Sequence, residues 1–222
     1  MRAESEPASW QTKPTDRFIL KWIKLRLASR VTERLVGLPW ISPWMITLGA
    51  SLLGVTAGLA FALGAGFIAG VLAMVSQVLD GVDGQYARIT GRDGPAGAFL
   101  DSVMDRYTDV ALVMGLTMYL IRLPLSIPVW FLLVLGFLAV SGTGLVSYST
   151  ARAELLGLSM GKPTLASKGT RTAVTALSGV ATPLWAQAPA VALFYLVLHA
   201  NGVVLWRILR AYGQCREGRK DE

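Results

Sequence analysis

The segment Asp80–Asp109, with the sequence DGVDGQYARITGRDGPAGAFLDSVMDRYTD, carries six of the fourteen acidic residues of this 222-residue chain. Apolar runs flank it on both sides, and their lengths approach that of a membrane span. Carboxylates at membrane depth are costly, so they are retained where they line a wet cavity, pair with a cation or bind an ion. The acidic cluster is therefore the first candidate for a functional site.

The composition is that of a membrane protein. Hydrophobic residues make up 53% of the chain and charged residues only 16%, and apolar runs of about 18 residues or more recur. The net charge of +7 comes mostly from Lys and Arg between and beside the apolar runs. That placement favours anionic lipid or a phosphorylated substrate as the partner and argues against nucleic acid. The single Cys215 excludes an internal disulfide.

Six apolar segments predict an all-α, polytopic membrane protein. The second segment is shorter than the ~20 residues of a span unless its helix continues through the acidic cluster, which would put Asp80 and Asp83 on its last turns. Lys and Arg gather on one side, so we expect six spans in a cytoplasmic or inner membrane, with both termini and the acidic cluster cytoplasmic. The segments run over about residues 41–63, 66–79, 97–121, 127–148, 173–188 and 190–209.

The first 36 residues form a separate unit in this interpretation, ahead of a membrane domain over residues 37–222. Residues 1–14 are polar and lack the early apolar stretch of a cleavable signal peptide. Apolar residues then recur at spacings of three and four over residues 16–36, with Lys and Arg between them. This pattern predicts an amphipathic helix lying in the membrane interface.

Glycine pairs at a spacing of four would allow helices to approach closely. Gly54-x-x-x-Gly58 and Gly66-x-x-x-Gly70 are the two examples. They suggest either packing within the chain, which we favour, or contact between the subunits of a homodimer.

The spacing of the carboxylates predicts a cation site. Asp80 and Asp83 are three residues apart, and Asp101 and Asp105 are four apart, so each pair shares one helix face. Two facing helices with two carboxylates each offer only oxygen ligands, which suit Mg²⁺, Mn²⁺ or Ca²⁺ better than zinc. The lone His199 is expected to be a packing residue rather than a ligand.

Arginines beside the carboxylates extend the site toward phosphate chemistry. Arg88 and Arg92 follow the first acidic pair, and a divalent ion with nearby guanidinium groups is suited to holding a diphosphate. The alternative is a helix pair held by Asp–Arg salt bridges, with Arg106 as a further partner. Asp109 continues the same helix face and is expected to support the site or to pair with an arginine.

The spacing Asp80-x-x-Asp83-Gly84-x-x-Ala87-Arg88, eight residues, Gly97-x-x-x-Asp101-x-x-x-Asp105 resembles the full signature of the CDP-alcohol phosphotransferases. The resemblance implies an enzyme that transfers a substituted phosphoryl group from a CDP-linked donor to an alcohol and releases CMP. It also implies two divalent ions, Mg²⁺ or Mn²⁺, held by Asp80, Asp83, Asp101 and Asp105, with Asp105 as the general base. The CDP-binding residues would be Asp80, Gly84, Ala87 and Arg88.

The region that follows is similar to enzymes that make phosphatidylinositol phosphate or its archaeal ether-lipid equivalent. The resembling stretch is Ser147-Tyr148-x-x-Ala151-Arg152-Ala153-Glu154, followed by Lys168 and Arg171. By this resemblance Arg152, Lys168 and Arg171 would bind the phosphate of inositol phosphate, with CDP-diacylglycerol as the donor. Their basic character is also explained by membrane topology alone.

Three other functions remain open at this level. Lys13-Pro14-x-Asp16 resembles the entry to di-inositol-phosphate phosphate synthases, which use CDP-inositol. Phosphatidylglycerophosphate synthesis is a second alternative. A cation transporter is a third, because it too would bury carboxylates between spans, although it would not require Gly84, Ala87 and Arg88 at these spacings.

Overall fold

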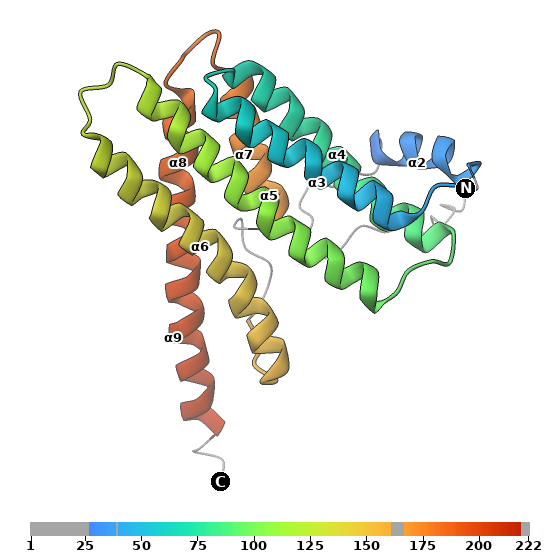
Figure 1. Cartoon of the computed structure of the whole chain (residues 1–222). Helices are drawn as coiled ribbons and strands as arrows, with labels where there is room; N and C mark the ends of the chain where they lie inside the picture. The colour runs from blue at the N-terminus through green and yellow to red at the C-terminus, as the bar shows by residue number, and fades with distance from the viewer. Residues whose placement is uncertain (1–26, 39, 161–166, 219–222) are drawn as a thin grey trace, which may run out of the picture.

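The computed structural model describes residues 27–38, 40–160 and 167–218, and this part of the chain is helical without any β-strand. The all-α prediction is thus confirmed. The elements are α2 (Ser29–Val36), α3 (Pro43–Ala62), α4 (Gly66–Ile89), α5 (Pro95–Arg122), α6 (Val129–Leu155), α7 (Lys168–Val180), α8 (Ala188–Tyr195), the π-helical turn η3 (Leu196–Ala200) and α9 (Asn201–Gly218) (Figure 1). The last three, α8, η3 and α9, follow one another without a break.

Four helical stretches are long and apolar enough to cross a membrane, namely α3, α4, α6 and residues 188–214. Helix α5 has 28 residues, which is long enough for a span, but it also carries several charged side chains. Helix α7 has only 13 residues, fewer than the ~20 of a simple span. Length and composition therefore support four of the six predicted spans.

Two helix boundaries matter for the site. Helix α4 continues from the second apolar segment through Asp80 and Asp83 to Ile89, as the shortness of that segment required. Helix α7 begins at Lys168 and ends at Val180, so the predicted segment 173–188 was displaced toward the C-terminus. Its first turn is polar although partly buried, so hydropathy does not indicate that the helix begins there. Pro183 follows its end, and proline cannot continue a helix without breaking a hydrogen bond.

Close glycine contacts hold the first helices together. A Cβ atom added to Gly115 of α5 would lie 2.0 Å from the Gly58 carbonyl oxygen of α3, and one added to Gly54 would meet the Thr108 side chain at 2.4 Å. Gly70 of α4 faces the backbone of α7 in the same way. These glycines pack within the chain, which confirms the favoured interpretation of the two pairs.

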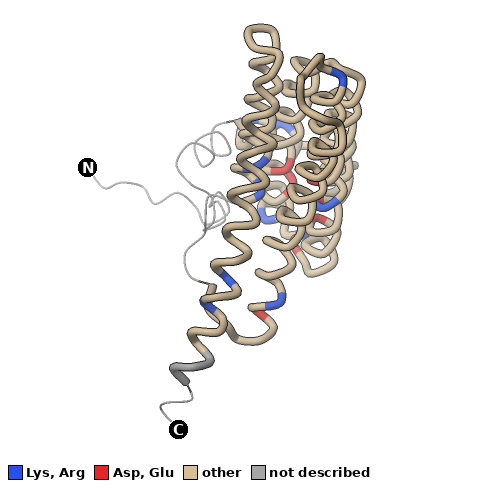
Figure 2. Tube along the Cα trace, turned by 90° about the vertical axis from the view of Figure 1, so that its left-hand side faces the viewer, with Lys and Arg blue, Asp and Glu red and all other residues tan. Residues whose placement is uncertain are grey.

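The connections between helices gather at two ends of the molecule. Residues 63–65, 123–128 and 181–187 lie at one end, whereas the α4–α5 connection and the C-terminal ends of α6 and α9 point toward the other (Figure 1). Most acidic positions lie in the middle of the helix bundle with Lys and Arg around them, and one lies near the lower end (Figure 2). The acidic cluster is therefore enclosed between helices.

Helix α2 packs beside the last turns of α4. Ala28 and Val82 belong to one apolar cluster between them, and Thr32 Oγ1 donates a hydrogen bond to Gln85 Oε1 at 3.2 Å. The rest of the predicted amphipathic helix, and the polar leader before it, lie outside the described residues. The described part of the N-terminal unit thus contacts the helix that carries Asp80 and Asp83.

Candidate active site

A short reversal brings the two acidic helices together. Gly91, just after α4, has φ +62°, in the left-handed region that glycine adopts most readily. Helix α5 then begins at Pro95, whose fixed φ suits the first position of a helix. The chain thus turns back along α3, and carboxylates from the last turns of α4 and the early turns of α5 meet, as the sequence pattern predicted.

Three carboxylates converge between these helices. Oxygen atoms of Asp80, Asp101 and Asp105 all lie within 4.8 Å of one another. All three side chains are partly buried, so their mutual repulsion is screened less than on an open surface. Such a group is stabilised by a cation, and an all-oxygen set of this kind suits a hard divalent ion.

A lysine ammonium stands at this cluster. Lys168 Nζ, from the first turn of α7, contacts both Asp80 Oδ1 and Asp105 Oδ1. The ammonium group takes the position of a cation shared by two of the three carboxylates. This contact, together with the oxygen-only donor set, shows that the residues present fit a bound divalent ion.

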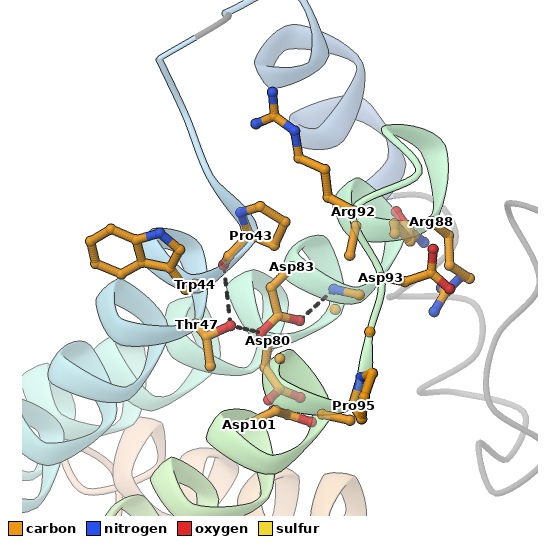
Figure 3. A pocket seen from close by; sticks show the side chains of 17 residues that line it. Pro43, Trp44, Thr47, Asp80, Asp83, Arg88, Arg92, Asp93, Pro95 and Asp101 are labelled. Atoms are coloured by element: carbon orange, nitrogen blue, oxygen red, sulfur yellow. Dashed lines mark hydrogen bonds between the residues drawn. The ribbon is translucent and has the colours of Figure 1, made fainter.

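Asp83 is held apart from that group. Thr47 Oγ1 of α3 donates to Asp83 Oδ2 at 2.8 Å, and the Gly84 backbone N–H donates to Asp83 Oδ1 (Figure 3). The Asp83 side chain is buried and lines a cavity beside the cluster. Its orientation is therefore fixed before any ligand enters.

The cavity has a volume of about 420 Å³ and lies between the start of α3, the end of α4 and the start of α5. Asp80, Asp83 and Asp101 line one side, whereas Arg88 and Arg92 line another (Figure 3). The remaining lining residues are Pro43, Trp44, Thr47, Gly81, Gly84, Gln85, Ala87, Asp93, Gly94, Pro95, Gly97 and Ala98.

The signature glycines serve this cavity rather than helix packing. A Cβ atom added to Gly97 would meet no atom within 4 Å, and one added to Gly84 would meet only Arg88 Nη1, at 3.4 Å. The open space at both positions favours room for a ligand over close helix approach. Gly84, Ala87 and Arg88 all face the same space.

A second charged network lies deeper along α5. Asp109 Oδ2 accepts from Arg171 Nη2 at 2.6 Å and from Arg106 Nη1 at 3.2 Å. Arg106 also lies 3.7 Å from Asp105 Oδ2 and donates to Ser147 Oγ of α6. The expected pairing of Asp109 with an arginine is confirmed, so the salt-bridge interpretation applies to Asp109.

The three cations predicted to bind the acceptor phosphate lie in different environments. Lys168 contacts the carboxylate cluster, and Arg171 is buried against Asp109. Arg152 is exposed on the last turn of α6. The structure thus joins Lys168 and Arg171 to the acidic helices but leaves Arg152 at the surface. His199 stacks on Tyr195, in line with its expected packing role.

Sequence reasoning missed two contributions to the site. Thr47 follows Ser42-Pro43, a helix-start signal that would have put it on the early turns of α3. Arg92 Nη1 donates to the Ile41 carbonyl at 3.1 Å, which holds the entry to α3 beside the motif helix. No pattern within the chain indicated that contact, because it joins residues 51 positions apart.

Several characterised proteins share part of this sequence. A bifunctional IPC transferase and DIPP synthase of Thermococcus kodakarensis is 34% identical over 137 residues, which cover 62% of this chain and 30% of that protein. The archaetidylinositol phosphate synthase of Pyrococcus horikoshii is 35% identical over 118 residues, covering 53% of this chain and 57% of that protein. The chain thus spans less than two thirds of the length of these relatives.

Solved structures share the fold. The phosphatidylinositol phosphate synthase of Mycobacterium tuberculosis with bound CDP-DAG superposes with a TM-score of 0.73 at 21% identity, over 84% of this chain and 94% of that one. The same enzyme in complex with manganese and citrate gives a TM-score of 0.72 at 20% identity, over 83% and 88% of the two chains.

The family indicated by the acidic signature is found independently by a family model. The model for CDP-alcohol phosphatidyltransferase matches residues 40–211, a range that includes helices α3 to α8, the first part of α9 and both acidic pairs. This chain belongs to the CDP-alcohol phosphatidyltransferase family.

Proposed function

We propose that this chain is a membrane enzyme that transfers a substituted phosphoryl group, in the favoured case phosphatidyl, from a CDP-alcohol to a polar alcohol and releases CMP. The observation that carries the proposal is the convergence of Asp80, Asp101 and Asp105 around a cation position, at the edge of a cavity that also contains arginines. A diphosphate-bearing ligand requires both features, because its charge must be neutralised and its phosphates oriented.

The donor binds in the cavity between α3, α4 and α5. Gly84 and Ala87 leave space for the nucleotide, and the Arg88 guanidinium can form two parallel hydrogen bonds to phosphate oxygens. The likeness to a mycobacterial synthase whose structure contains CDP-DAG supports this assignment. Thr47 keeps Asp83 turned toward the cavity so that its carboxylate does not have to reorient when the donor arrives.

Asp80, Asp83, Asp101 and Asp105 are the proposed ligands of two divalent ions, Mg²⁺ or Mn²⁺. When bound, the ions would neutralise the diphosphate and the departing CMP. Lys168 must then leave Asp80 and Asp105, and its flexible four-carbon stem allows that movement. Asp109 keeps Arg171 and Arg106 in place through this change.

Asp105 is the proposed general base. Its carboxylate accepts the proton of the acceptor hydroxyl as the hydroxyl oxygen forms a bond to the β-phosphorus of the donor. The bond between that phosphorus and the bridging oxygen breaks, and CMP leaves with the electron pair. Arg106, 3.7 Å from Asp105, helps to orient the carboxylate.

Inositol phosphate is the proposed acceptor. Lys168, Arg171 and Arg152 would supply the charge that binds its phosphate. Lys168, once released from the carboxylates, is the member of this set best placed to reach an acceptor beside Asp105. The inositol-linked activities in the names of the relatives favour this acceptor.

The second candidate is a di-inositol-phosphate phosphate synthase that uses CDP-inositol. The DIPP synthase activity in the names of the bifunctional relatives favours this candidate. Phosphatidylglycerophosphate synthesis has no comparable support among these relatives. A cation transporter would account for the carboxylates but not for the family match over residues 40–211.

In the membrane we propose six crossings, with α5 and α7 completing the four apolar stretches, and with the termini and active site cytoplasmic. Residues 1–36 would lie along the interface ahead of the membrane domain of residues 37–222, and a homodimer remains part of the proposal. Arginines toward the C-terminal ends of α6 and α9 agree with this orientation.

The test is CMP release by the purified full chain in lipid nanodiscs with Mg²⁺ or Mn²⁺. CDP-diacylglycerol is offered with inositol phosphate, glycerol phosphate, inositol, serine or phosphatidylglycerol, and the panel is repeated with CDP-inositol. We expect CDP-diacylglycerol with inositol phosphate to give the fastest release. Folded protein that neither releases CMP nor binds it in the presence of either metal would refute the proposal.

A further inference from the structure

A second, much smaller cavity lies behind the carboxylate cluster, between α3, α4, α5 and α7. Its volume is about 10 Å³, and nearly all of its lining side chains are polar. They include Ser51, Gln77, Asp80, Thr108, Lys168 and Thr172. The cavity is separate from the larger one in which the donor is proposed to bind, although Asp80 lines both.

Gln77 is the unusual member of this lining. Its side chain is 7% exposed, and neither its carboxamide oxygen nor its carboxamide nitrogen has a hydrogen-bond partner among the described residues. Buried polar side chains are almost always hydrogen-bonded to protein or to ordered water. A carboxamide that lines a polar cavity in this state points to a ligand held inside it.

The volume and the neighbouring groups define that ligand. A cavity of about 10 Å³ has room for a single water molecule. Lys168, whose ammonium contacts Asp80, lines the same space, and its positive charge disfavours a second cation. The Ser76 and Thr172 hydroxyls already donate to the carbonyls of Ala50 and Lys168. The Ser51 and Thr108 hydroxyls also line the cavity, but the Asp80 carboxylate is its strongest acceptor for a water.

We propose that one buried water bridges the Gln77 carboxamide to the Asp80 carboxylate, and that Gln77 is thereby a positioning residue for Asp80. Gln77 and Asp80 are three residues apart on α4 and share one helix face. The water accepts from Gln77 Nε2 and donates to an Asp80 oxygen, which limits the rotation of the carboxylate. This inference rests on the proposed function, in which Asp80 holds a divalent ion.

The test compares Gln77→Leu with wild type in lipid nanodiscs by Mn²⁺ titration, followed by electron paramagnetic resonance, and by thermal unfolding. Groups that orient metal ligands typically affect metal affinity by about 10–100-fold, so we expect Gln77→Leu to bind Mn²⁺ roughly tenfold more weakly. Its melting temperature should be unchanged or higher, because an apolar side chain of similar size removes a polar group that is costly to bury.

Asn201→Leu is the matched control, since Asn201 also has a carboxamide, which donates to the Leu138 and Val197 carbonyls, and it lies on α9 and lines neither cavity. We expect it to lower the melting temperature and to leave Mn²⁺ affinity unchanged. If Gln77→Leu binds Mn²⁺ as tightly as wild type, the positioning role is wrong. If wild type itself binds no Mn²⁺, the proposed function fails instead. Should Gln77→Leu not fold, Gln77→Met replaces it with the same expected outcomes.

Discussion

Replacement of Lys168 by methionine tests whether its ammonium holds the place of a metal ion. Methionine keeps the length and apolar character of the stem but removes the charge that contacts Asp80 and Asp105. Breaking a buried ion pair by removing one partner costs about 3–5 kcal/mol. The side chains of Lys168, Asp80 and Asp105 are 22%, 16% and 13% exposed, so solvent screening reduces that cost to about 2–3 kcal/mol.

The metal-free variant should therefore unfold about 4–12 °C below wild type, since 1 kcal/mol shifts the midpoint of a chain of this size by about 2–4 °C. Its Mn²⁺ affinity should rise, because the ion no longer has to displace an ammonium. If displacement costs wild type about 1.4 kcal/mol, the dissociation constant falls tenfold. Thermal unfolding in nanodiscs with EDTA, and again across a Mn²⁺ titration, measures both effects.

Arg122→Met is the control for the loss of one positive charge. Arg122 is the last residue of α5, and its side chain reaches to 3.9 Å from a Cβ position at Gly64, at the end of the bundle away from the carboxylates. It should leave Mn²⁺ affinity unchanged. If Lys168→Met binds Mn²⁺ no more tightly than Arg122→Met does, Lys168 does not compete with the metal and the reasoning is wrong.

Three further predictions concern the base, the orientation of Asp83 and the helix frame. Asp105→Asn should reduce CMP release by about 10²–10⁴-fold while the protein still folds; near-normal turnover would exclude Asp105 as the base. Thr47→Val removes the 2.8 Å hydrogen bond to Asp83, worth about 1.5–3 kcal/mol for a charged acceptor, and should weaken Mn²⁺-dependent CMP binding by roughly 10–100-fold in calorimetry; an unchanged affinity would show that Asp83 needs no such support. Gly115→Ala would place a methyl group 2.0 Å from the Gly58 carbonyl oxygen. It should destabilise the protein by about 1–3 kcal/mol, which a lower melting temperature would show. Unchanged stability would mean that α3 and α5 can separate without a cost in free energy.

Helix α4 is the element that the sequence predicts best. The second apolar segment is too short to span, so its helix had to continue through Asp80 and Asp83, and it does. The convergence of Asp80 with Asp101 and Asp105 also follows from their spacing once the two helices face each other. What spacing cannot predict is that Asp83 would turn toward α3, because Thr47 on another helix decides it.

Helix α7 shows why the remainder of the site was less predictable. Its polar first turn contains Lys168 and Arg171, which hydropathy treats as a loop between spans. These side chains are accommodated inside because the carboxylates of α4 and α5 neutralise them. A buried cation with a partner far away in the sequence carries no periodic signal, so its place is determined only by the tertiary fold.

The distance along the chain between these opposite charges has a consequence for biogenesis. Lys168 follows Asp80 by 88 residues and Asp105 by 63, and Arg171 follows Asp109 by 62. During translation α4 and α5 therefore leave the ribosome before the cations that neutralise them are synthesised. We expect α5 to remain exposed to water until α7 has been synthesised. The variant Leu112→Cys tests this, because Leu112 is a buried position of α5. Its cysteine should react with a water-soluble thiol reagent in nascent chains stopped before residue 161 and should be protected in the full chain. Protection in both chains would show that α5 enters the membrane unaided. Reaction in the shorter chain alone would show that the ion pairs of the site also complete the insertion of α5.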